Sequence, residues 1–237
     1  MIAKPKYIPA FKVKWLTVFL ALYGLFVLLP FLAPVMMKWN LPVVGKVIYG
    51  AYSFVCHQLP QRSLFFFGPE LMYSVDEIQA AWQQTDNPFV LRQFVGNPEM
   101  GWKVAWSDRM ISMYGGVWVA GLLWALFGKR NPKVPIWIFA LLAFPIVLDG
   151  LTHVISDFSG LVQGFRYTNH WLALLTRNSF PASFYAGDAI GSFNSWARWL
   201  SGLWFGFGLV WWAFPYVSES FEGPAPHGFI PEKSLNS

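Results

Sequence analysis

Four long runs of apolar residues constrain this 237-residue chain more than any other feature of its sequence. A helix needs about 20 predominantly apolar residues to cross the hydrocarbon core of a bilayer. The runs that meet this length are residues 15–37, 110–127, 134–155 and 196–217. Charged residues make up 12% of the chain, against about 25% in a typical soluble domain. The sequence therefore predicts an integral membrane protein.

We expect an all-α fold, in which four transmembrane helices form a polytopic bundle within one membrane domain, residues 1–217. The apolar stretch 41–55 is too short to cross a membrane and suits a re-entrant or interfacial helix. Residues 69–104 form an outer helical insertion in this prediction, because the helical pattern at Val75–Gln84 starts with acidic residues. Residues 218–237 contain three prolines and no apolar periodicity, which predicts an extended tail.

The orientation in the membrane follows from basic residues, because short loops rich in lysine and arginine stay in the cytoplasm. Such residues precede the first apolar run and separate the second run from the third: Lys4, Lys6, Lys12, Lys14, Lys129, Arg130 and Lys133. Both clusters are cytoplasmic only if both termini are, and four spans give that parity. We therefore expect a multi-pass protein of the cell membrane with cytoplasmic termini. The basic residues form no long run, which argues against nucleic acid as a partner.

The first candidate site is a polar motif at the end of the short apolar stretch. It brings together a thiol, an imidazole, an amide, a guanidinium and a hydroxyl, from Cys56, His57, Gln58, Arg62 and Ser63. These side chains could cap a helix end beside the lipid headgroups, or they could belong to a functional site. Cysteine next to histidine is a weak motif by itself. The chain has one cysteine, so an intrachain disulfide is excluded.

The second candidate site surrounds Asp149, which lies inside the third apolar run. An ionisable residue in a membrane span is costly and by default marks a functional site or a buried ion pair. Thr152 and His153 follow at positions i+3 and i+4, so the three residues share one helix face. Arg109 and Arg198 lie at a similar depth if their spans end at the cytoplasmic surface. Either arginine could neutralise Asp149 inside the bundle.

These residues occur in the order Cys-His-Gln-x-Pro-x-Arg-Ser at Cys56–Ser63, Arg109, Tyr114-Gly115, Asp149-Gly150-x-Thr152 and Arg198-x-x-x-Gly202. The pattern resembles the uncharacterised membrane proteins grouped as domain of unknown function 2085. The resemblance covers about residues 40–217 and implies a shared architecture and shared polar residues, but no reaction, because the family has no established activity. Members often carry a second cysteine two positions before the matching arginine, where this chain has Ser107. Segment 69–104 resembles an insertion relative to shorter members.

Three functions remain open, and the first is the one we expect. It is a non-catalytic accessory or scaffold subunit that binds lipids and other membrane protein subunits, or a second copy of itself. The second is a metal-dependent enzyme in which Cys56, His57, Asp149 and His153 hold a divalent metal such as zinc, since thiolate, imidazole and carboxylate are zinc ligands. The third is a small-molecule or ion carrier, although the chain has no internal repeat. No Walker, GxSxG or HExxH motif identifies catalytic residues.

Overall fold

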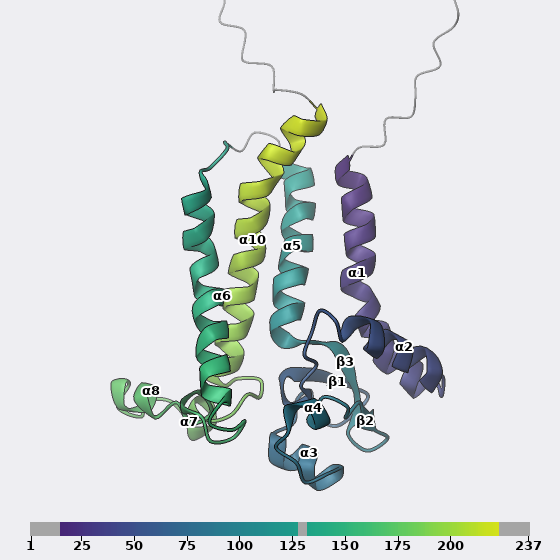
Figure 1. The fold of residues 1–237 in the computed structure, drawn as a ribbon, viewed down its shortest axis with the longest axis vertical. Helices are drawn as coiled ribbons and strands as arrows, with labels where there is room; N and C mark the ends of the chain where they lie inside the picture. The colour runs from purple at the N-terminus through teal and green to yellow at the C-terminus, as the bar shows by residue number, and fades with distance from the viewer. Residues whose placement is uncertain (1–14, 128–131, 223–237) are drawn as a thin grey trace, which may run out of the picture.

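The computed structural model describes residues 15–127 and 132–222. Four long helices lie side by side in a row, in the order α6, α10, α5 and α1, above a folded cap (Figure 1). Their bounds are Trp15–Lys38 for α1, Asp108–Phe127 for α5, Ile136–Asp157 for α6 and Phe193–Glu222 for α10. Each is long and apolar enough to cross a membrane, so the predicted helical membrane fold with four candidate spans is confirmed.

The row is held together by close packing of its central pair, α5 and α10. A Cβ atom added to Gly202 would lie 2.0 Å from Ser112 Oγ, and one on Gly206 would lie 2.6 Å from the Val117 nitrogen. Small residues at such crossings let two helix backbones approach closely. α6 packs along α10, and α1 packs along α5. α1 also packs against α2 and β3, and its Trp15 and Phe19 rings contact Phe214 of α10. The predicted bundle takes the form of an open row, with α6 and α1 at its ends (Figure 1).

The cap contains a small antiparallel sheet that the sequence analysis missed. Its strands are β1 Ser63–Phe66, β2 Gly96–Asn97 and β3 Gly101–Ser107, in the order β1-β3-β2. Two of these strands lie wholly or partly in the insertion 69–104, which we expected to be helical. Most residues of β3 are buried, on both faces of the sheet. The strand therefore lacks the alternation of apolar and polar residues that would identify it.

Short helices complete the cap. They are α2 Pro42–Tyr52, η1 Pro60–Arg62, α3 Val75–Ala81, α4 Pro88–Leu91, α7 Phe165–Thr168, α8 His170–Leu175 and α9 Ala182–Tyr185. α2 is the short helix predicted at 41–55, and it packs against the second half of α1; its Tyr52 Oη donates to the carbonyl of Phe26, in the middle of α1, at 2.7 Å. α3 begins with a capping box between Ser74 and Glu77, which explains the acidic first turn.

The insertion shares one hydrophobic core with the segments around it. Ile78 and Leu91, which it contributes, are fully buried in the same cluster as Phe65 and Leu161. The insertion is therefore an integral part of the cap and cannot be removed without exposing that core.

The far end of α10 differs from the predicted extended tail. The helix continues to Glu222, so residues 218–222 are helical. Lys133 pairs with Glu219, and its ammonium lies 5.2 Å from the centre of the Tyr216 ring, which stabilises these last turns. The rest of the predicted tail, residues 223–237, lies outside the described residues. So do residues 1–14, with their four lysines, and the pair Lys129 and Arg130.

Candidate functional site

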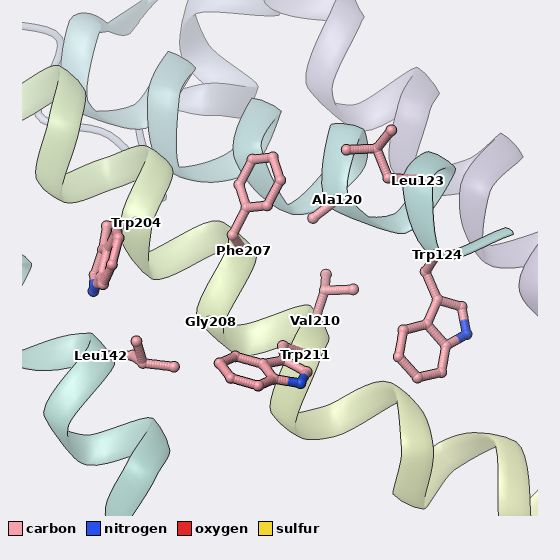
Figure 2. A pocket seen from close by; sticks show the side chains of 9 residues that line it. All are labelled: Ala120, Leu123, Trp124, Leu142, Trp204, Phe207, Gly208, Val210 and Trp211. Atoms are coloured by element: carbon pink, nitrogen blue, oxygen red, sulfur yellow. The ribbon is translucent and has the colours of Figure 1, made fainter. Parts of the chain in front are cut away.

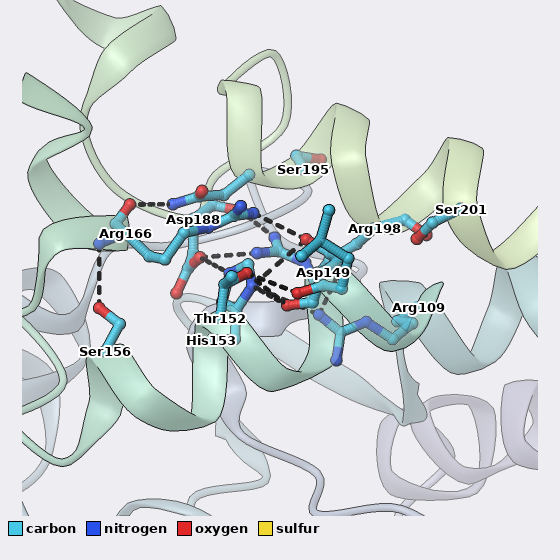
Figure 3. A network of polar contacts seen from close by, with 12 residues as sticks. Arg109, Asp149, Thr152, His153, Ser156, Arg166, Asp188, Ser195, Arg198 and Ser201 are labelled. Carbon is cyan, nitrogen blue, oxygen red and sulfur yellow. Dashed lines mark hydrogen bonds and ion pairs between the residues drawn. The ribbon is translucent and has the colours of Figure 1, made fainter. Parts of the chain in front are cut away.

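A group of buried ion pairs lies where the long helices meet the cap (Figure 3). We call it the ion-pair network, and its members are Arg62, Asp108, Arg109, Asp149, His153, Asp157, Arg166, Asp188 and Arg198. They come from η1, α5, α6, α7, α10 and the loop that precedes α10. Its four arginines balance its four aspartates, so the network is electrically neutral when His153 is neutral.

Asp188 is the centre of one half of the network. Its carboxylate accepts from Arg62 Nε at 2.9 Å and from Arg198 Nη1 at 2.6 Å. Arg62 also makes a bidentate pair with Asp157, with both distances 2.9 Å. Arg198 Nε donates to the two oxygens of Asp108 at 2.8 and 2.7 Å. These bonds connect α5, α6 and α10 to the cap.

Asp149 is the centre of the other half. It accepts from Arg109 Nη2 at 2.6 Å and from Arg166 Nη2 at 2.7 Å. His153 lies between the halves, with Nδ1 3.0 Å from the Asp149 carbonyl oxygen and Nε2 3.7 Å from Asp188 Oδ1. Arg109 Nη2 also lies 3.4 Å from Nδ1. Nε2 has no hydrogen-bond partner among the described residues, so His153 packs between the two halves on one face of α6 without bonding them together.

Ion pairing shifts the pKa values of Asp188 and Arg62, two network residues that lie in the cap. Burial by itself raises the pKa of a carboxyl group. At Asp188, the opposing effect of Arg62 and Arg198 is larger and holds the pKa well below its ordinary value. Burial also opposes the charge on Arg62, but Asp188 and Asp157 outweigh burial and raise its pKa. Both groups are therefore charged at neutral pH, which suits a structural ion pair better than a proton donor or acceptor.

The sequence analysis left Arg109 and Arg198 as alternative partners of Asp149. The structure pairs Asp149 with Arg109, whereas Arg198 pairs with Asp108 and Asp188. Thr152 lies one residue before His153 on α6, but its hydroxyl donates to the Leu148 carbonyl of its own helix at 2.8 Å. The same hydroxyl lies 3.1 Å from the Asp149 backbone carbonyl, so Thr152 bonds to its own helix and stabilises α6 locally.

Cys56 is buried within the cap, where the turn between α2 and β1 meets the end of β3. Its sulfur accepts from the backbone nitrogens of Gln58 and Ser107, both at 3.4 Å. The Ser107 hydroxyl lies 3.6 Å from the same sulfur. Ser107, where the resemblance implies a second cysteine in many family members, is therefore in direct contact with Cys56.

The rest of the first motif shapes the turn between α2 and β1. Gln58 has a positive φ of 53°, and its side-chain nitrogen donates to the Tyr49 carbonyl at 2.9 Å. The Ser63 hydroxyl donates to the Leu59 carbonyl at 2.9 Å. His57 is exposed, and its Nδ1 accepts from the Leu59 nitrogen at 3.1 Å. Three residues of the motif thus bond to nearby backbone, while Arg62 alone reaches the ion-pair network.

The four residues that the alternative metal-enzyme hypothesis places around zinc are not assembled into a ligand set. Cys56 faces Ser107, and the Asp149 carboxylate is occupied by Arg109 and Arg166. Within residues 15–127 and 132–222, no group of three or more His, Cys, Asp and Glu side chains is placed to hold a metal ion. Guanidinium groups occupy the position beside the carboxylate that a cation would need.

The sequence analysis missed Arg166 and Asp188, although one signal was available. Together with Arg177 they are the charged Asp, Glu, Lys and Arg residues in positions 158–195, a segment rich in aromatic and small residues. An isolated charge in such a segment is costly to bury and points to a partner. Both residues are buried and paired.

Lys103 is another buried charge that the sequence analysis missed. It lies within β3 with no exposed surface, and its Nζ donates to the Gln58 carbonyl at 2.8 Å and the Arg92 carbonyl at 2.6 Å. Burial lowers the pKa of Lys103 to about 7, an effect that Cys56 opposes and Arg92 reinforces. Through these two hydrogen bonds, Lys103 ties the first motif to α4.

Comparison with known proteins supports the resemblance found in the sequence. Residues 99–212 match the family described as "Predicted membrane protein (DUF2085)". An uncharacterized protein of Methanocaldococcus jannaschii is 25% identical over 149 residues, which cover 62% of this chain and 70% of that protein. No solved structure matches the chain. The matched region contains most of the ion-pair network but not the Cys56–Ser63 motif, and neither description assigns an activity.

Proposed function

We propose that this multi-pass membrane protein, similar to the DUF2085 proteins, is a non-catalytic accessory or scaffold subunit that binds lipids and other membrane proteins. We place it in the cell membrane, with both termini in the cytoplasm and the cap on the outer side. The observation that carries the proposal is the open row of helices. α6 stands at one end of the row, and only 11% of its most apolar window is buried within the described chain.

The uncovered side of α6 is apolar along most of its length. Its exposed large side chains are Ile136, Trp137, Leu141, Phe144, Val147, Leu148, Leu151, Val154 and Ile155. Lipid tails are as apolar as leucine, so hydrophobicity alone does not drive helices together in a membrane. Close packing of complementary side chains drives helices together instead. Because α6 packs on one side only, its other side offers a surface for such packing to a partner subunit. A second copy of this chain is one such partner.

Two hollows in the row support the lipid-binding part of the proposal. One has a volume of about 500 Å³ and lies between α5, α6 and α10 (Figure 2). Its walls are apolar and include the indole rings of Trp124, Trp204 and Trp211. The second, of about 710 Å³, lies between α1, α5 and α10. Both lie on segments long enough to cross the membrane, where the surrounding molecules are lipids, so acyl chains fit them best.

The chemistry of the ion-pair network also favours a structural role. Each of its four aspartates bonds to at least one guanidinium at 2.9 Å or less. Buried ion pairs of this kind hold elements in register, and they leave no carboxylate unpaired for acid or base chemistry. The network thus fixes the cap on the helices and keeps the row rigid enough to present α6.

The test is the composition of the full-length protein purified from native membranes in a mild detergent. We expect particles larger than one chain plus detergent, which contain lipid and a second membrane protein or a second copy. Leu141→Trp on α6 should reduce this association. Leu25→Trp on α1 is the matched control, because Leu141 and Leu25 are 66% and 62% exposed. A monomer without a partner at native expression would contradict the proposal.

A further inference from the structure

The apolar hollow between α5, α6 and α10 leads to an ion pair at its cap end. Ala120, which lines the hollow, lies about three turns after Arg109, so the two residues share one face of α5. Leu142, which lines the hollow from α6, lies about two turns before Asp149 on one face of that helix. Arg109 Nη2 donates to the Asp149 carboxylate at 2.6 Å. This bond therefore joins α5 to α6 on the faces that the hollow occupies.

Arg109 keeps part of its bonding capacity unused. A guanidinium group has five N–H donors. Nη2 bonds to Asp149, whereas Nη1 makes no hydrogen bond or ion pair with any described residue and points away from Asp149 (Figure 3). The Arg109 side chain is 15% exposed, and a Cβ atom added to Gly150 would lie 3.7 Å from Nη1. Because glycine has no side chain to cover it, Nη1 is available to an acceptor that approaches from outside.

The Asp149 half of the ion-pair network carries an excess of positive charge. It contains one carboxylate, on Asp149, and two guanidinium groups, on Arg109 and Arg166, which gives a net charge of +1. The half around Asp188 carries the compensating charge, because three aspartates there face two arginines. The end of the hollow therefore favours an anion. Where a helix bundle meets the edge of a membrane, basic pockets bind the anionic headgroups of lipids.

The depth of the hollow matches that of a lipid acyl chain whose headgroup lies at the ion pair. At a rise of 1.5 Å per residue, Leu142 lies about 10 Å from Asp149, and Ala120 lies about 16 Å from Arg109. One leaflet contributes about 15 Å to a hydrocarbon core of about 30 Å. The hollow thus lies at the depth of the acyl chains in the leaflet next to the cap.

We propose that the hollow and Arg109 together bind one anionic phospholipid of this leaflet. The lipid phosphate accepts a hydrogen bond from Arg109 Nη1, and one acyl chain lies in the hollow against Trp204 and Trp211 (Figure 2). Hydrogen bonds between arginine and phosphate are charge-assisted and stronger than those between neutral groups. The inference rests on the lipid-binding part of the proposed function and adds to it the class of lipid and the orientation of the bound molecule.

The test is native mass spectrometry of the full-length protein in mild detergent. Phosphatidylglycerol is titrated in one series, and phosphatidylcholine with the same acyl chains in another. One molecule of phosphatidylglycerol should bind about tenfold more tightly than phosphatidylcholine. Arg109→Lys keeps a positive charge beside Asp149 but replaces the planar guanidinium by a single ammonium, so it should remove most of this preference. Arg177→Lys makes the same change at an exposed position of the cap and should keep the preference.

A second pair of variants tests the hollow without touching the ion pair. Leu123 lines the hollow and is 41% exposed, whereas the adjacent Leu122 is 39% exposed and lines neither hollow. Leu123→Trp places an indole ring in the wall and should weaken phosphatidylglycerol binding by about tenfold. Leu122→Trp is the matched control and should bind this lipid like the wild type.

The results separate this site from the broader scaffold function. An unchanged preference in Arg109→Lys, or equal binding by Leu123→Trp and Leu122→Trp, would overturn the site. Lipid bound by the wild type without a preference for phosphatidylglycerol would overturn the site but leave general lipid binding in place. A wild-type protein that binds neither lipid would overturn both the site and the lipid-binding part of the proposed function.

Discussion

Replacing Asp188 with asparagine tests the ion-pair network at its most connected point. The Asp188 side chain is 7% exposed and pairs with Arg62 at 2.9 Å and with Arg198 at 2.6 Å. Two unit charges about 4 Å apart attract by about 4 kcal/mol at an effective dielectric constant of about 20. Part of this attraction offsets the cost of removing the charges from water. Removing one partner of a buried pair therefore destabilises a protein by about 3–5 kcal/mol.

Asp157→Asn is the matched comparison within the same network. Asp157 also pairs with Arg62, but its side chain is 26% exposed, and Arg62 keeps Asp188 as a second partner. An ion pair this close to solvent contributes about 0–1 kcal/mol. Asp188→Asn should therefore lower the free energy of unfolding by at least about 2 kcal/mol more than Asp157→Asn.

The assay is unfolding of the purified full-length protein by SDS, followed by tryptophan fluorescence. Glu99→Gln makes the same chemical change at an exposed position of the cap and should leave the free energy of unfolding unchanged. Equal losses for Asp188→Asn and Asp157→Asn would refute the reasoning, because the burial and the number of partners would then have no effect. A stable Asp188→Asn protein would refute it as well.

Three other predictions concern the cap and the membrane topology. Because the pKa of Lys103 is lowered from 10.5 to about 7 in the folded protein, the unfolded state binds more protons between these values, and stability should rise with pH across that range. Lys103→Met should abolish this rise in an SDS titration repeated at several pH values, and an unchanged dependence of stability on pH in this variant would contradict the prediction. Ser107→Cys should form a disulfide with Cys56 under mild oxidation, because the two side chains are in contact; thiol titration before and after oxidation gives the answer, and two free thiols would be the adverse result. A reporter that is active only in the cytoplasm should work when it is fused after Ser237, and activity only of an exported reporter would reverse the proposed orientation.

The length of the apolar runs was enough to predict the four spans. The observed α1, α5, α6 and α10 begin and end within a few residues of the predicted runs, except at Glu222, where α10 is longer. The order of the helices in the row could not be predicted, because hydropathy reports which segments enter a membrane and not which ones pack together. The sequence shows the glycines at positions 202 and 206, but only the structure shows that α5 is the helix that approaches them closely.

Part of the candidate site could also be predicted from the sequence, and the rest could not, because hydropathy and spacing do not report tertiary contacts. Asp149 stood out because a charge inside an apolar run is costly, and the depth of Arg109 made it a reasonable partner. Arg166 and Asp188 lie in a segment of short helices and turns without periodicity, so counting residues could not place them against α6 or α10. Lys103 escaped notice because its strand is buried on both faces and shows no alternation.

Photocrosslinking from α6 in native membranes tests the proposed scaffold function most directly. A photoreactive amino acid at Leu148, on the exposed side of α6, should form an adduct with another membrane protein or with a second copy of this chain. The same amino acid at Phe139, whose ring stacks on Trp212 of α10 at 5.0 Å, should react within the chain. Adducts with lipid alone at Leu148, at native expression, would contradict the account.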